Sequence, residues 1–214
     1  MKRFIASICV FLCITVACMS DDADITENHP NYIVGEVSKD VPLGMSSGKP
    51  TWKVILPTDI NEFEKEKIIV SLSDWSLSTN YLQWKIEYKD VPIEQSHDIL
   101  TECKDENAWN IFVYSVQQSK MPLLEGDSTN RAAGYAWWFV AQNGNRCSLV
   151  YFMEELGIAQ VDDLNRVVRH EFGHAFGLVH NNDGKSVMSA YPISTAEWIQ
   201  STDKKQYCDY WKCP

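Results

Sequence analysis

A segment of eleven residues, 170–180, constrains this chain more than any other part of it. It reads His-Glu-Phe-Gly-His-Ala-Phe-Gly-Leu-Val-His. Residues four apart share one face of a helix, so His170 and His174 project together and can bind one metal ion. Gly177 can adopt the left-handed conformation that ends a helix, which lets the chain turn and bring His180 round as a third ligand. Three imidazoles with a fourth position left for water are typical of a catalytic zinc site.

The acidic residue of this segment, Glu171, suits a general base that is not itself a ligand. Zinc lowers the pKa of a bound water toward about 7 and polarises a carbonyl group. Glu171 can accept the proton of the attacking water and then deliver a proton to the leaving amine. The segment therefore predicts one catalytic Zn²⁺ and a hydrolytic reaction. An amphipathic helix with two solvated histidines is the structural alternative.

The segment resembles the zinc-binding helix of the metzincin peptidases and is closest to their matrixin and serralysin branches. Those proteins continue with a methionine turn beneath the metal, and here Met188 follows His180 by eight residues. The resemblance implies that Met188 packs under the ligands. Several metzincins place a tyrosine two residues after this methionine, whereas Tyr191 comes three after it. Tyr191 is therefore either a transition-state donor or, with Pro192, part of the wall of the substrate pocket.

The resemblance implies an α+β fold: a two-lobed metzincin-like domain with a mixed, twisted five-stranded sheet, two long helices, the methionine turn and a C-terminal helix. Hydrophobic periodicity predicts a compatible order of elements. These are strand 51–56, helix 60–77, strands 81–88, 110–116, 134–141 and 147–153, a helix that carries the histidines, and helix 201–210. Pro57-Thr58-Asp59 is expected to cap the first helix and Asp162-Asp163 the second.

Protein or peptide substrates are expected to lie extended and to pair with an edge strand. By analogy with the family this edge is Gly134-Tyr135-Ala136-Trp137. Packing within the sheet is the alternative role of Trp137. The loop 117–133 could hold a structural Ca²⁺ or a second Zn²⁺ through Glu125 and Asp127, although a solvated loop explains the same residues.

The N-terminus predicts export. Lys2 and Arg3 precede an apolar run from Phe4 to Val16, which is too short to span a bilayer and is typical of a signal peptide in residues 1–18. Thr15-Val16-Ala17-Cys18 resembles a bacterial lipobox. The chain is therefore either anchored at the cell surface or outer membrane through lipidated Cys18, its one expected membrane contact, or cleaved and secreted.

Residues 19–50 are rich in Asp, Asn, Ser, Gly and Pro and predict a tether or short pro-segment. The catalytic domain is expected to occupy residues 51–214 and to act as a monomer. Without residues 1–18 the chain has 17 basic and 29 acidic residues, a net charge of −12, because Lys2 and Arg3 are removed from the 19 basic residues. Such a charge disfavours nucleic acid as a partner.

Four cysteines remain beyond residue 18, and an even number in an exported chain favours disulfides. The short spacing of Cys208 and Cys213 suggests a local bridge, which leaves Cys103 to pair with Cys147. Two functions besides peptide hydrolysis stay open. One is a zinc-containing protein that binds peptides or cell-surface material without turnover, and the other is a zinc hydrolase that acts on a different bond.

Overall fold

The computed structural model describes residues 32–33, 51–90, 109–117, 119, 133–141, 146–154, 161–181, 183–189 and 198–214. The predicted signal peptide with Cys18, most of the tether and the greater part of the loop 117–133 lie outside these ranges. So do Cys103, Tyr191 and Pro192. None of the helices in the described ranges combines the length and the apolar character that a membrane span needs.

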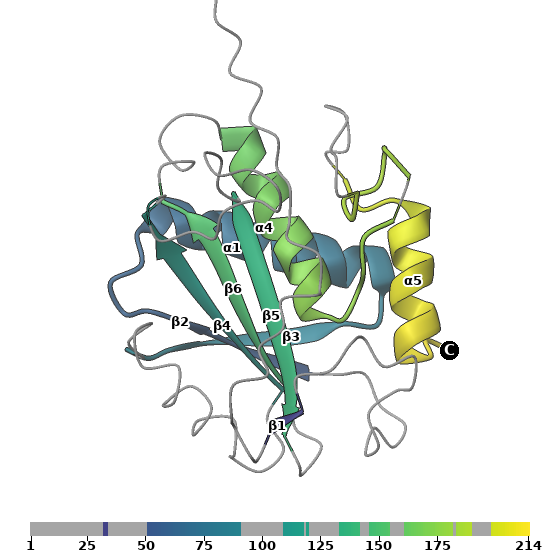
Figure 1. Ribbon diagram of the computed structural model, residues 1–214, viewed down its shortest axis with the longest axis horizontal. Helices are drawn as coiled ribbons and strands as arrows, with labels where there is room; N and C mark the ends of the chain where they lie inside the picture. Colours follow the sequence, from purple (N-terminus) through teal and green to yellow (C-terminus); the bar gives the residue numbers. More distant parts are fainter. Residues whose placement is uncertain are drawn as a thin grey trace, which may run out of the picture.

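The helices and strands follow the order that the sequence predicts (Figure 1). They are β1 (Tyr32–Ile33), β2 (Thr51–Leu56), α1 (Glu62–Thr79), β3 (Gln83–Tyr88), β4 (Trp109–Val116), β5 (Gly134–Ala141), β6 (Arg146–Met153), α4 (Val161–Ala175) and α5 (Ser201–Trp211). The α+β class is therefore confirmed.

The strands form one mixed sheet in the order β1-β5-β6-β4-β2-β3. β3, β2, β4 and β6 run parallel, and β5 is antiparallel to β6. The five long strands are the ones expected. The two residues of β1 add a sixth strand, which pairs with Val140 and Ala141 at the outer edge of β5. The expectation of little structure in residues 19–50 missed this pairing, because two residues carry no alternation pattern that a sequence could reveal.

Burial explains the position of each strand in the sheet. In the central strand β4, buried residues run almost without interruption, as expected for a strand covered on both faces. β3 at one edge alternates between partly buried and exposed positions over its first four residues. Its side chains face the core only on one side.

The helix starts correct the sequence prediction in two places, α1 and α4. Asn61 caps α1, and its side chain accepts a hydrogen bond from the backbone N–H of Glu64. Asparagine is among the strongest N-caps, so the helix starts after it instead of after the Pro57-Thr58-Asp59 segment. α4 begins at Val161, one residue before Asp162, which places the two aspartates in its first turn, where the helix dipole favours negative charge. α5 begins at Ser201, as predicted, and its cap is Gln200.

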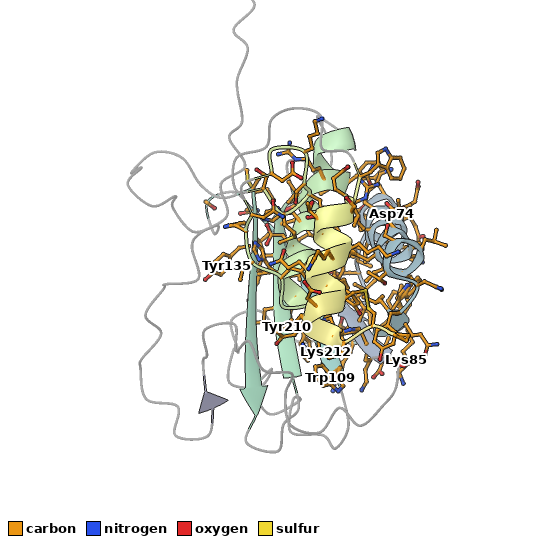
Figure 2. The ribbon with its side chains drawn as sticks, turned by 90° about the vertical axis from the view of Figure 1, so that its right-hand side faces the viewer. Asp74, Lys85, Trp109, Tyr135, Tyr210 and Lys212 are labelled. Atoms are coloured by element: carbon orange, nitrogen blue, oxygen red, sulfur yellow. A yellow bond between two sulfur atoms is a disulfide. The ribbon has the colours of Figure 1, made fainter. Side chains whose placement is uncertain are left out.

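The helices α1, α4 and α5 lie on one side of the sheet (Figure 2). α4 packs against α1 and against β5 and β6. Aromatic rings fill the space behind the end of α4. The ring of Phe176 lies 5.4 Å from Trp52 on β2 and 5.8 Å from Trp75 on α1, and Trp52 lies 5.7 Å from Trp211 on α5. Each such pair stabilises the fold by about 0.5–1.5 kcal/mol beyond its buried area. The cluster fixes the point at which the chain leaves α4.

Two cysteines of the last helix region, Cys208 and Cys213, form a disulfide with their Cα atoms 4.7 Å apart. This is the local bridge that the spacing suggested. Cys147 on β6 is also disulfide-bonded. Its expected partner, Cys103, lies outside the described residues, so that pairing stays a prediction.

Candidate metal centre

The end of α4 is built as its sequence predicts. The helix stops at Ala175, and Gly177 has a φ of 93°, which residues with a side chain rarely adopt. The backbone N–H of Gly177 donates to the carbonyl of His174 at 2.7 Å, and that of Leu178 donates to Gly173 at 3.0 Å. These bonds satisfy carbonyls that a helix end leaves without partners. The chain turns there and leads to His180.

The three histidines meet at one point. The Nε2 atoms of His170 and His174 are 3.0 Å apart, those of His174 and His180 are 3.1 Å apart, and those of His170 and His180 are 3.2 Å apart. Zinc bound tetrahedrally at about 2.0–2.1 Å separates its nitrogen ligands by roughly 3.3 Å. The three nitrogens therefore fit one ion after shifts of a few tenths of an ångström. No other group of three ligand side chains at such spacing occurs in the described ranges.

Backbone carbonyls orient the two helical histidines. His170 Nδ1 lies 2.6 Å from the carbonyl oxygen of Val187, and His174 Nδ1 lies 2.8 Å from that of Leu178. A carbonyl only accepts hydrogen bonds, so each Nδ1 carries the proton and each Nε2 presents a lone pair. The close approach of these two Nε2 atoms is therefore a convergence of lone pairs, not a hydrogen bond. A cation at their common centre relieves the repulsion, and carbonyls on the far ring nitrogens are the usual support of metal-bound histidines.

The local environment also keeps the rings neutral. Burial lowers the pKa of His170 well below its usual value of 6.5, and the nearby rings of His174 and His180 lower it further. Burial lowers the pKa of His174 to about 4, against the opposing effect of the hydrogen bond to Leu178. Both rings are therefore uncharged at pH 7, which is the form that binds zinc.

The carboxyl group of Glu171 is fully buried beside the start of β5. A Cβ atom at Gly134 would lie 2.5 Å from Glu171 Oε1 and 2.6 Å from a methyl group of Val167, closer than real contacts allow. Only glycine at position 134 thus leaves room for the carboxyl group. The predicted base and the predicted substrate strand are therefore in contact at this position.

Met188 packs directly against the helix between its two histidines. It is fully buried, and a Cβ atom at Gly173 would lie 2.1 Å from its sulfur. A methyl group there would also come within 3.1 Å of the ring of Trp75. Glycine at position 173 therefore admits the methionine side chain against α4.

Some predicted residues are described in part or not at all. Gly134 is buried and Tyr135 and Ala136 are partly buried on β5, whereas Trp137 is placed only by its backbone. Three features were missed by sequence reasoning: the carbonyl of Val187, the space at Gly173 and the space at Gly134. No local pattern signals them, because each acts on a residue of a different segment.

Fold and site together define a zinc metallopeptidase of the metzincin type. The model of the matrixin family matches residues 73–206, which is more than half of the 214 residues. The chain belongs to the matrixin family.

Two solved structures are among those similar to this chain. The crystal structure of archaemetzincin from Methanopyrus kandleri has 13% sequence identity and a TM-score of 0.49, and the match covers 79% of this chain and 99% of that one. The crystal structure of myroilysin has 13% identity and a TM-score of 0.46, over 78% of this chain and 86% of that one. No curated protein sequence matches the chain.

Proposed function

We propose that this chain is a zinc-dependent endopeptidase that cleaves extended protein substrates, with Glu171 as general base and acid. The observation that carries the proposal is the convergence of three Nε2 atoms within 3.2 Å of one another beside a buried carboxyl group. His170, His174 and His180 would hold the ion. Bound there, zinc would supply an acidified water and a polarised substrate carbonyl.

Residues of the chain orient the ligands and transfer the protons. The backbone carbonyls of Val187 and Leu178 accept hydrogen bonds from Nδ1 of His170 and His174, so the Nε2 lone pairs stay directed at the centre. Glu171 accepts the proton of the attacking water and passes a proton to the leaving amine. Gly134 leaves the space that the carboxyl group occupies.

The substrate is proposed to add to the outer edge of β5. Among the described residues, β1 pairs with this edge at Val140 and Ala141, beyond the Gly134–Trp137 end. An extended peptide that pairs there would pass directly beside Glu171. Main-chain pairing would supply affinity for many sequences, with side-chain pockets setting the preference.

We also propose that the protein acts after export. The disulfide between Cys208 and Cys213 and the disulfide-bonded state of Cys147 support an oxidising compartment. A lipid anchor on Cys18, or release by cleavage near it, follows only from the sequence pattern. Mass spectrometry of the N-terminal peptide from the native source distinguishes a lipidated cysteine from a free terminus.

The test compares wild type with Glu171→Gln, both starting after residue 18, in zinc content and in cleavage of casein and of a peptide library. We expect one zinc per chain in both, and at least about 10²-fold slower cleavage by the variant, the usual scale of general acid–base catalysis. Glu62→Gln, on the exposed start of α1, is the matched control and should cleave normally. If the zinc-loaded wild type bound peptides without cutting them, the peptidase proposal would be wrong and the protein would be a zinc-containing peptide-binding protein.

A further inference from the structure

The carboxyl group of Asp203 on α5 is completely buried and accepts four hydrogen bonds. Its Oδ1 accepts from Ser186 Oγ and from Asn181 Nδ2, the latter at 3.3 Å. Its Oδ2 accepts from the backbone N–H of Val187 at 3.2 Å and from that of Gln200 at 2.8 Å. Three of these four donors belong to the segment that follows the last histidine.

The four donors require that both carboxyl oxygens of Asp203 act as acceptors. Ser186 Oγ itself accepts from the backbone N–H of Met188 at 2.9 Å and from Asn181 Nδ2 at 2.7 Å. Both lone pairs of the hydroxyl group are used, so its proton must point at Asp203. An amide in place of the carboxyl group offers one acceptor oxygen and one NH₂ group, which would face two donors. A charged carboxylate satisfies all four.

These hydrogen bonds lead to two of the three histidines. Val187, whose N–H is held by Asp203, offers its carbonyl to His170 Nδ1 at 2.6 Å. Asn181 directly follows His180, and its backbone N–H donates to the carbonyl of Met188 at 3.0 Å. The buried carboxylate of Asp203 thus contacts both Val187, whose carbonyl orients His170, and Asn181, which follows His180.

We propose that Asp203 is a positioning residue of the metal centre: it fixes the Val187 carbonyl that orients His170 and the Asn181 backbone that carries His180. The inference rests on the proposed zinc site, although the orientation of His170 does not depend on the metal. Asp203 lies on a different element from every ligand and acts on the ion only through them. Asp203 also completes the capping box of α5 by accepting from the backbone N–H of Gln200, but its other three donors lie outside that helix.

The first experiment measures zinc affinity of Asp203→Asn by competition with a chromophoric chelator. We expect affinity to fall by about 10–100-fold, the usual cost of losing an outer partner of a metal ligand. Cobalt-substituted protein should show an altered visible absorption spectrum, because the geometry of the ligand set changes. A variant with wild-type affinity and an unchanged cobalt spectrum would overturn the proposal.

The second experiment needs no metal. Nitrogen NMR of the metal-free wild type should show His170 as a single neutral tautomer protonated on Nδ1, because the Val187 carbonyl accepts that proton. Asp203→Asn should populate the other tautomer as well. A histidine that keeps its single tautomer in the variant contradicts the role of Asp203. If the wild type binds no zinc, the proposed function fails while this spectrum still decides the inference.

Two further variants separate positioning from stability. Should Asp203→Asn not fold, Ser186→Ala removes one donor to the carboxylate, and zinc affinity should fall by about threefold or more, the effect of one hydrogen bond. Unchanged affinity in that variant counts against the proposal. The control is Cys208→Ser with Cys213→Ser, which destabilises α5 through loss of a short cross-link. This control should keep its zinc affinity, and an equal loss of affinity there would assign the effect of Asp203 to stability alone.

Discussion

His170 and His174 lie one turn apart on α4, and the helix backbone alone places both rings on one face. His180 lies beyond the helix end, and its ring joins them through contacts between separate segments. The chain must turn at Gly177, and the residues after His180 must pack against α5. The shared face of two ligands therefore depends on local helix geometry, whereas the position of the third depends on a tertiary hydrogen-bond network. Substitutions at the helical ligands and at the third ligand should therefore have different effects.

The largest expected effects come from the ligands themselves. His174→Ala and His180→Ala should each weaken zinc binding by more than about 10²-fold, beyond the cost of an outer partner. The metal-free proteins should differ. His174 is deeply buried and its loss leaves the Leu178 carbonyl without its donor, which costs about 1–3 kcal/mol. His180 is only partly buried, so its loss should cost less. Thermal unfolding after dialysis against a chelator measures both, and equal destabilisation would remove the contrast.

The next prediction concerns the base rather than the ligands. Gly134→Ala places a methyl group where Glu171 Oε1 lies, so the carboxyl group must move. A displacement of about 1 Å at a reacting group can cost on the order of 10²-fold in rate. Zinc content should stay at one per chain, because no ligand is touched. Steady-state cleavage of one peptide substrate gives the loss in kcat.

A double variant checks the assignment. If Gly134→Ala acts by moving the base, it should add little to the loss already caused by Glu171→Gln. Additive losses would place the effect elsewhere in β5.

The sequence predicted most of the fold because its signals are local. Alternation marked the strand that became β3, and the spacing of Phe63, Ile68, Leu72 and Trp75 marked α1. The helical histidines and Glu171 were predictable for the same reason, as was the turn at Gly177. In each case the residues that make the structure are neighbours in the chain.

The features that the sequence did not predict depend on contacts between residues far apart in the chain. Asp203 acts on Val187 from 16 residues away, and Gly134 makes room for a carboxyl group 37 residues later in the chain. As a sequence, Ser201-Thr202-Asp203 only signals the start of a helix, and it gives no sign that the carboxyl group turns inward. The start of α1 was misplaced because Asp59 and Asn61 are both good caps, and tertiary packing decided between them.

The packing of Met188 gives a third, smaller effect. In an isolated helix, alanine in place of Gly173 would stabilise by about 1 kcal/mol. Here its methyl group would collide with the sulfur of Met188, so we expect a net destabilisation of about 1–3 kcal/mol, typical of overpacking. Chemical denaturation of the metal-free variant measures it.

Truncation of the methionine tests the cause of that loss. Met188→Ala alone should cost about 2–5 kcal/mol, the usual cost of a core cavity. The combination with Gly173→Ala should be less destabilised than the sum of the two single variants, because the collision is gone. Strict additivity would mean that Met188 does not press on the helix at this point.

The smallest effect compares two buried carboxyl groups. Asp203 receives four donors from neighbouring segments, whereas the carboxyl group of Glu64 on α1 has side-chain hydrogen bonds with two residues, Ser115 at 2.7 Å and Asn61. Burial raises the pKa of Glu64 above its ordinary value of 4.5, and this outweighs the opposing hydrogen bonds. The folded state therefore binds the proton more tightly than the unfolded state. Its stabilising contribution is complete below pH 4.5 and is lost as the pH rises through the raised pKa.

Glu64→Gln has no proton to lose and keeps an oxygen that can accept from Ser115. The stability of the variant relative to wild type should therefore rise between pH 4.5 and pH 7, by an amount on the order of 1 kcal/mol. Asp203→Asn should lose stability at pH 7, since its amide cannot satisfy the donors around it. Denaturation curves of the metal-free proteins at several pH values compare the two directly. If Glu64→Gln lost stability at pH 7 as Asp203→Asn does, the contrast between a poorly and a fully satisfied carboxyl group would be wrong.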